Sequence, residues 1–223
     1  MKKETYSKIF LVLCSINITC LLISNILAVK TVNVFGLIFT ASNMLFPITY
    51  ILNDVFTEVY GFNKSRFVIW ISFFCNLLMV TVFEIGIYLP ADESFKIQNE
   101  LVDILGSTPR VLFASFMAFL VGNFANAISL SKIKVKTKGK YLAFRTIAST
   151  IIGEGLDTLV FVPIVFIGKL DFNNIIKLII DIYVLKVLVE IVLTPLTYKV
   201  IEYIKKKEDI DTFDENLKYR ILK

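Results

Sequence analysis

The chain has 223 residues, a mean hydropathy of +0.73 and 56% hydrophobic residues, 20 of its residues being phenylalanine. Repeated apolar runs of membrane length exclude an ordinary soluble domain. The net charge is only +5, histidine is absent, and the three cysteines lie in apolar runs without a CxxC pair. This pattern argues against a zinc site or a disulfide framework.

Six apolar segments, each near the roughly 20 residues that a helix needs to cross a bilayer, follow one another along the chain. They cover about residues 9–28, 34–52, 67–89, 111–130, 141–167 and 175–204. The first is too long for a signal peptide and lacks a small-residue cleavage site, so we interpret it as a retained helix. We predict an all-α, polytopic membrane protein with six transmembrane helices in one domain, residues 1–204, followed by a charged cytoplasmic tail, residues 205–223, that is a solvated helix or disordered.

The basic residues predict the orientation, because cytoplasmic loops are enriched in lysine and arginine. A cytoplasmic N terminus places most of them inside: Lys2, Lys3, Lys8, Lys64, Arg66, the five lysines at 132–140 and those from Lys199 onward. The outer loops then hold few. We therefore predict N-in, C-in topology in the inner membrane. The five-lysine loop lies between two predicted spans, so we expect a topogenic role for it and no nucleic-acid partner.

The stretch from Asn43 to Gly61 carries a polar stripe. At about 100° per residue, one helical face holds Asn43, Phe46, Pro47, Tyr50, Asp54, Thr57, Glu58 and Gly61. Apolar residues cover the rest of the circumference. A lipid-facing anchor would be apolar all round, so this helix is predicted to face a polar cavity or another helix.

The fifth predicted span is the most polar, and one band of it holds Thr146, Thr150, Gly153, Glu154, Asp157, Thr158 and Phe161. A carboxylate at membrane depth is costly unless it has a partner. Three interpretations stay open for Glu154 and Asp157: they pair with Arg145, Lys186 or another cation, they hold a proton, or they await a ligand that supplies donors. A buried ion-pair network that only fixes helix packing is the structural alternative. Lys186 and Glu190, four residues apart, are placed to satisfy each other.

Two carboxylate pairs, Asp54/Glu58 and Glu154/Asp157, favour a binding site shared by two helices. A carboxylate accepts two N–H groups side by side, an amide both donates and accepts, and an aromatic ring stacks on a planar heterocycle. The candidate amides are Asn43, Asn76, Asn123 and Asn126, although any one of them is more often an interhelical hydrogen bond.

Several catalytic signatures are missing from the sequence. It has no GxxxxGK[ST] phosphate-binding loop, no nucleophile elbow and no HExxH motif. We therefore expect no enzyme, no cofactor and no metal site.

Five runs in order resemble one known family: SNILAVKTV (24–32), FPITYILNDVFTEVYG (46–61), PR with AS (109–115), GNFAN (122–126) and RTIASTIIGEGLDTLVF (145–161). Together they resemble the bacterial queuosine precursor transporters, also called the vitamin-uptake-like or VUT family, over about residues 20–170. The resemblance implies a six-helix inner-membrane importer of 7-deazaguanines for tRNA modification. The implied substrates are 7-cyano- and 7-aminomethyl-7-deazaguanine and, for some members, queuine.

The chemistry of a deazaguanine suggests roles for the polar residues. We expect Glu154 or Asp157 to accept its amidine edge. Asn43, Asn76 or Asn126 would bind the opposite edge, with Phe46 or Tyr50 stacking on the ring. Asp54 and Glu58, near the cytoplasmic end, would pair with Lys64 or Arg66 as a gate or coupling element, to which we also assign Arg145.

Two other functions fit six helices in about two hundred residues. One is the substrate-binding subunit of an energy-coupling-factor transporter, which needs partner subunits and ATPases. The other is a membrane scaffold whose carboxylates are purely structural. The sequence leaves open which deazaguanine is preferred, what energy source drives movement, and whether the protein is a monomer or a homodimer.

Overall fold

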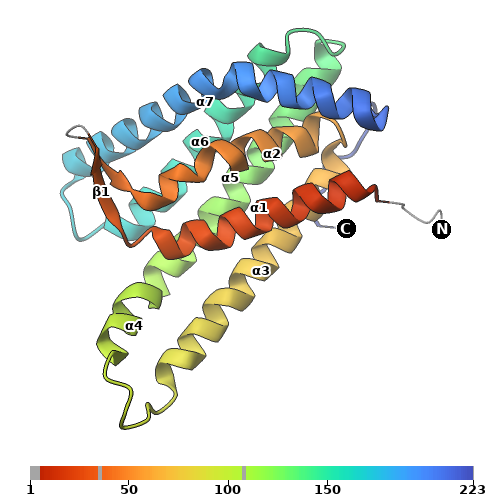
Figure 1. Cartoon of the computed structure of the whole chain (residues 1–223). Helices are drawn as coiled ribbons and strands as arrows, with labels where there is room; N and C mark the ends of the chain where they lie inside the picture. Colours follow the sequence, from red (N-terminus) through yellow and green to blue (C-terminus); the bar gives the residue numbers. More distant parts are fainter. Residues whose placement is uncertain (1–5, 35–36, 107–108, 223) are drawn as a thin grey trace. The chain divides into compact units, whose positions relative to one another are not determined.

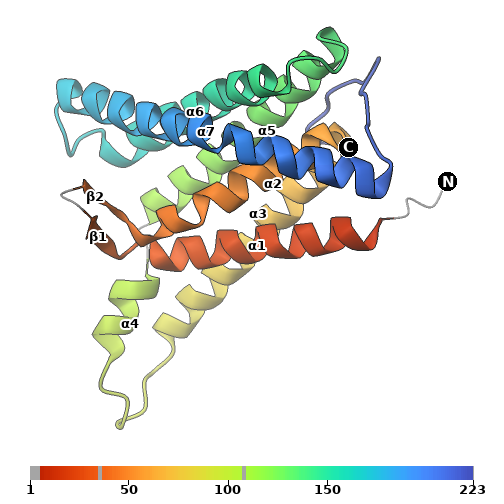
Figure 2. The same ribbon diagram turned by 45° about the horizontal axis from the view of Figure 1, so that its top comes forward.

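The computed structural model describes residues 6–34, 37–106 and 109–222. It confirms the all-α class, with one small antiparallel hairpin added (Figures 1 and 2). The elements in order are α1 (Lys8–Leu27), β1 (Thr31–Val34), β2 (Leu37–Thr40), the 3-10 helix η1 (Ala41–Met44), α2 (Phe46–Glu58), α3 (Phe62–Tyr88), α4 (Gln98–Leu105), α5 (Pro109–Lys136), α6 (Leu142–Phe166) and α7 (Phe172–Glu208).

Four described segments are long and apolar enough to cross a membrane: Lys8–Leu27, Phe62–Tyr88, Gln98–Lys136 and Leu142–Phe166. They correspond to the first, third, fourth and fifth predicted spans. The helix at the sixth predicted span, α7, is long enough but carries Asp181, Lys186 and Glu190 along its middle.

The prediction of one continuous helix over residues 34–52 is wrong. Residues 31–34 and 37–40 pair as the β-hairpin instead, and α2 begins only at Phe46. The hairpin strands read TVNV and LIFT, rich in β-branched residues, which favour a strand over a helix. With 13 residues, α2 is about 20 Å long at 1.5 Å per residue.

The chain folds into two compact units, which we describe separately. The first comprises residues 1–52 and 74–106, and the second residues 53–73 and 107–223. In the first unit α1 packs against η1, and the Asn25 amide donates to Asn76 Oδ1 at 2.7 Å between α1 and α3. Asn76 thus makes the interhelical hydrogen bond that is the ordinary role of a membrane asparagine.

In the second unit α6 packs against both α5 and α7. Two glycines allow a close approach of α5 and α6. A Cβ added to Gly122 would lie 2.8 Å from Asp157 Cβ, and one added to Gly153 would lie 2.7 Å from Asn126 Cβ. Small-residue packing of this kind is common between membrane helices. It places Asn126 and Asp157 at the crossing.

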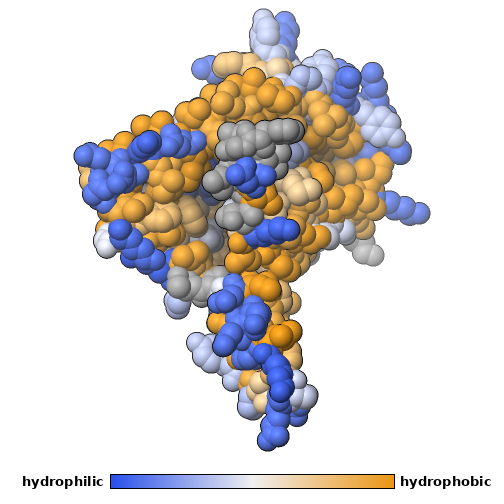
Figure 3. Space-filling model, turned by 60° about the vertical axis from the view of Figure 1, so that its left-hand side comes forward, coloured by the Kyte–Doolittle hydropathy of each residue, from blue (hydrophilic) through white to orange (hydrophobic). Residues whose placement is uncertain are grey.

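Apolar side chains remain exposed along the long helices, and apolar residues predominate on the face shown in Figure 3. Examples are Leu78 on α3, Leu159 on α6 and Val192 on α7, with exposed fractions of 64%, 55% and 77%. Soluble proteins rarely show such extended apolar surface. Lipid contact accounts for it.

Residues 209–222, which we call the C-terminal strap, pack on the second unit in an irregular, extended course. The expected solvated helix therefore ends at Glu208. The Thr212 amide donates to the Val59 carbonyl at 3.1 Å, and the Trp70 indole donates to the Ile221 carbonyl at 3.0 Å. These contacts tie the strap to the turn between α2 and α3 and to the first turns of α3.

Candidate functional site

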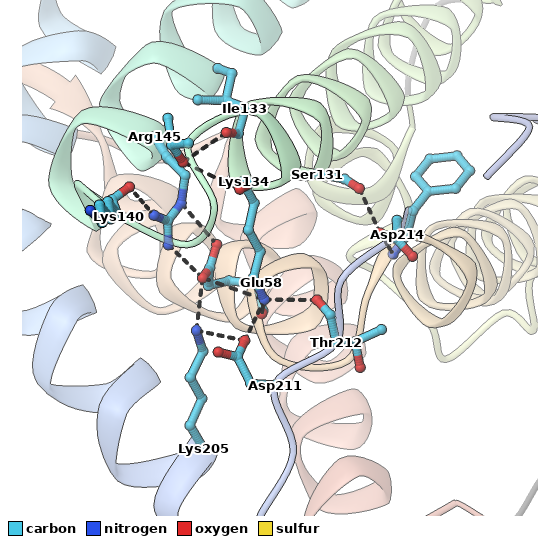
Figure 4. Close-up of polar contacts among 12 residues, drawn as sticks. Glu58, Ser131, Ile133, Lys134, Lys140, Arg145, Lys205, Asp211, Thr212 and Asp214 are labelled. Atoms are coloured by element: carbon cyan, nitrogen blue, oxygen red, sulfur yellow. Dashed lines mark hydrogen bonds and ion pairs between the residues drawn. The ribbon is translucent and has the colours of Figure 1, made fainter. Parts of the chain in front are cut away.

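Glu58 is the centre of a buried ion-pair cluster in the second unit (Figure 4). Its side chain is fully buried, and Arg145 Nη2 lies 2.6 Å from its Oε1 while Arg145 Nε donates to its Oε2 at 3.4 Å. Lys205 Nζ lies 2.8 Å from Oε1 and Lys134 Nζ 3.6 Å. Asp211 of the strap bridges the two lysines at 2.5 and 2.9 Å. We call these five residues the Glu58 cluster.

The Glu58 cluster joins five parts of the chain: α2, α5, α6, α7 and the strap. Lys134 and Arg145 flank the short α5–α6 turn, where Gly139 has φ +76° and a Cβ would lie 2.9 Å from the Phe213 ring. Gly61, with φ +82°, is similarly close to the strap: a Cβ added to it would lie 2.7 Å from Thr212 Cγ2. Both positions require glycine, since the conformation is left-handed and the space is filled.

The strap residue Asp211 is held by both lysines. Burial by itself would raise the pKa of Asp211, but hydrogen bonds from Lys134 and Lys205 outweigh this and lower the pKa below its usual value. Asp214, three residues on, accepts from the Phe62 amide at 2.8 Å and from the Ser131 hydroxyl at 2.5 Å. The strap is thus fastened by two carboxylates.

A second polar group is formed by residues of α2, α6 and α7. Lys186 of α7 pairs with both carboxylates of α6, Glu154 Oε2 at 2.8 Å and Asp157 Oδ2 at 2.5 Å. Glu190, one turn along α7, interacts electrostatically with Glu154 and with Asp54 of α2. We call Asp54, Glu154, Asp157, Lys186 and Glu190 the central acidic cluster.

Four buried acceptor atoms in or beside the central acidic cluster have no hydrogen-bond partner: Asp54 Oδ2, Asn126 Oδ1, Thr158 Oγ1 and Glu190 Oε1. Asp54 and Asn126 hydrogen-bond to each other. Because Asn126 Oδ1 stays unpartnered, the Asn126 amide is the donor and the two remaining oxygens are free. Unpaired buried acceptors are costly, and they identify a place where a ligand with N–H donors would be stabilised.

The structure forms some of the ion pairs that the sequence suggested and not others. Lys186 pairs with Glu154 and Asp157, which was one of the three interpretations, and it does not pair with Glu190. Arg145 pairs with Glu58 instead of the α6 carboxylates. Lys64 and Arg66 do not reach Glu58: Lys64 lies over the Tyr60 ring, and Arg66 donates to the Arg220 carbonyl.

The remaining predicted site residues belong to the first unit. The rings of Phe46 and Tyr50 stack on each other with centroids 5.9 Å apart and planes 13° from parallel. Asn76 is bonded to Asn25, and the side chain of Asn43 lies outside the described side chains. Asn123, weighed as an amide candidate, accepts from Asn53 at 3.1 Å within the second unit.

Sequence reasoning missed the roles of Lys134, Lys205 and Asp211. It placed Thr158 in the polar band of the fifth span without a role, and it gave Glu190 only a local partner. One signal was present for Lys134: it lies about two helical turns beyond Asn126, on the same face of α5. In the part of the chain that the structure describes, no group of three His, Cys, Asp or Glu residues is placed to hold a metal ion.

Apolar helices of membrane length around a buried polar cluster define a membrane transport protein more readily than any other class. A family model described as "Putative vitamin uptake transporter" matches residues 40–200. The chain belongs to this family. It is also 29% identical over 178 residues to a Bacillus subtilis (strain 168) protein named "Probable queuosine precursor transporter". That match covers 78% of this chain and 77% of the relative. No solved structure matches significantly.

Proposed function

We propose that this protein imports queuosine precursors across the bacterial inner membrane. The substrates would be 7-cyano- and 7-aminomethyl-7-deazaguanine, with queuine as a further candidate. One observation supports this most directly: the second unit buries four unpartnered acceptor atoms on helices that also expose apolar surface. A deazaguanine is planar and rich in N–H donors. The name of the Bacillus subtilis relative supports the same substrate class.

The central acidic cluster is the proposed binding site. Glu154 or Asp157 can accept the amidine edge if the substrate displaces Lys186, which holds both carboxylates in the structure. Asn126 would bind the opposite edge. Asn43, Asn76, Phe46 and Tyr50, which the sequence suggested as amide and stacking partners, lie in the first unit, and their roles stay predictions.

The Glu58 cluster is the proposed gate. It clamps α2, α5, α6 and α7 together at the end where the lysine-rich α5–α6 turn lies. Asp54 and Glu58 are one helical turn apart on α2, so movement of this helix would affect both clusters. Opening towards the cytoplasm would separate Glu58 from Arg145 and Lys205.

We further propose six membrane crossings with both termini in the cytoplasm, as the basic residues indicate. At about 20 Å, α2 is shorter than the roughly 30 Å hydrocarbon core, so the second crossing needs the hairpin together with α2. Reporter fusions after residues 89, 137 and 223 test the topology. An active alkaline phosphatase at residue 137 or 223 would refute it.

Uptake in a suitable host tests the function. A strain that neither makes nor imports queuosine precursors receives this gene alone, and queuosine in its tRNA is measured at low external precursor. Restored modification is expected. If none appears with the protein in the membrane, the energy-coupling-factor alternative is tested by adding the partner subunits. If the purified protein binds no heterocycle, the scaffold function is the one that remains.

The site is tested separately. Unchanged uptake by both Glu154→Gln and Asp157→Asn would refute the assignment of these carboxylates to substrate binding.

A further inference from the structure

The central acidic cluster has too few cations for its carboxylates. Four carboxyl groups, those of Asp54, Glu154, Asp157 and Glu190, lie together with one ammonium group, that of Lys186. The Glu58 cluster has the opposite composition, with three cations and two carboxylates. Of these two clusters, the central acidic cluster is the one with fewer cations than carboxylates.

The deficit is concentrated on two residues. The Lys186 ammonium group is paired with two carboxylates, Glu154 Oε2 at 2.8 Å and Asp157 Oδ2 at 2.5 Å. Among the residues that the structure describes, Asp54 and Glu190 have no lysine or arginine partner, and each keeps one buried oxygen without a hydrogen bond. Both side chains are only 1% exposed, so bulk water does not supply the missing donors.

We propose that Asp54 and Glu190 bind a protonated amine of the substrate, so that this transporter prefers a cationic precursor to a neutral one. This rests on the proposed function. Of the two precursors, 7-aminomethyl-7-deazaguanine carries an ammonium group with three N–H donors. The 7-cyano compound carries at the same position a nitrile, which only accepts hydrogen bonds. Two carboxylates attract the ammonium group and offer no hydrogen-bond donor to the nitrile.

The two other unpartnered atoms suit the rest of such a ligand. Asn126 Oδ1 on α5 and Thr158 Oγ1 on α6 are neutral acceptors and can receive ring N–H groups. The neutral and the charged acceptors come from different helices. The amine and the heterocycle therefore have adjoining subsites, which meet where Asn126 contacts Asp54, and the amine subsite determines the preference.

The test measures binding of both precursors to purified full-length protein in lipid nanodiscs by calorimetry. We expect the aminomethyl compound to bind at least about tenfold tighter, as charge-assisted hydrogen bonds predict. Glu190→Gln and Asp54→Asn should each remove most of this preference by weakening aminomethyl binding. Their effect on cyano binding should be under about threefold. Asp181→Asn, an exposed carboxylate on the same helix as Glu190, is the matched control and should change neither affinity.

Equal binding of the two precursors by the unmodified protein would overturn this inference and leave the proposed function standing. Binding of neither would overturn both. A preference that persists in Glu190→Gln and Asp54→Asn would assign the amine to another part of the chain. Because the ratio of affinities in the unmodified protein is itself decisive, the test does not depend on the stability of the variants.

Discussion

Replacing Glu58 by glutamine should destabilise the second unit by leaving buried cations without their counterion. The three cations that contact Glu58 differ in how many other acceptors they keep. Lys134 keeps the Glu58 carbonyl, Asp211 and the Thr212 carbonyl as acceptors, and Lys205 keeps Asp211 and is 20% exposed. Among the described residues, Arg145, which is 1% exposed, keeps only the Lys140 carbonyl as an acceptor.

The cost therefore comes mainly from one buried guanidinium. Breaking a buried ion pair by removing one partner costs about 3–5 kcal/mol, and we expect the lower end, about 3 kcal/mol, because the glutamine oxygen still accepts one hydrogen bond. Unfolding by sodium dodecyl sulfate in mixed micelles, followed by fluorescence of the sole tryptophan, measures the change.

The control for this variant is Glu215→Gln, which makes the same chemical change at an exposed strap residue. The double variant Glu58→Gln/Arg145→Gln should cost less than the sum of the two single variants, because it removes both charges of the pair. If Glu58→Gln and Glu215→Gln lower the free energy of unfolding equally, or if the double variant is additive, the buried pair does not hold these helices together.

Three further predictions use the same preparation. Lys186→Met should lower the free energy of unfolding by only about 1–2 kcal/mol, since its carboxylate partners are roughly a quarter exposed, but should abolish precursor uptake; retained uptake would remove Lys186 from the site. Gly153→Ala should cost about 1–3 kcal/mol by overpacking the α5–α6 crossing, whereas Gly86→Ala, with nothing within 4 Å, should be neutral or stabilising; equal effects would contradict the close approach. The lowered pKa of Asp211 means that its contribution to holding the strap is full above its unfolded pKa of about 3.9 and disappears as pH falls through the lower folded value. Fluorescence of Trp70, which is bonded to the strap, should therefore stay constant from pH 7 to 5 and change below about pH 4, and Asp211→Asn should show the changed signal already at pH 7.

The sequence determined the class of protein and the polar faces of its helices. Apolar runs of membrane length and a band of carboxylates at helical spacing are local patterns, so Glu154, Asp157, Asp54 and Glu58 could all be singled out from the sequence. The β-hairpin was missed because its length and apolarity fit a membrane helix, while the β-branched residues that decided it received less weight.

Only the tertiary structure decided which charges meet. The sequence left Arg145 open as a partner of Glu154 and Asp157, yet it pairs with Glu58, 87 residues away in sequence, because the α5–α6 turn brings it against the end of α2. In the sequence, Lys134 and Asp211 lie in charged segments and were interpreted as solvated, because their partners come from distant segments. The partner of an ion is set by the packing of distant segments, and no local periodicity records it. The atoms that remain without partners, on Asp54 and Glu190, could be recognised only after every other charge had been placed.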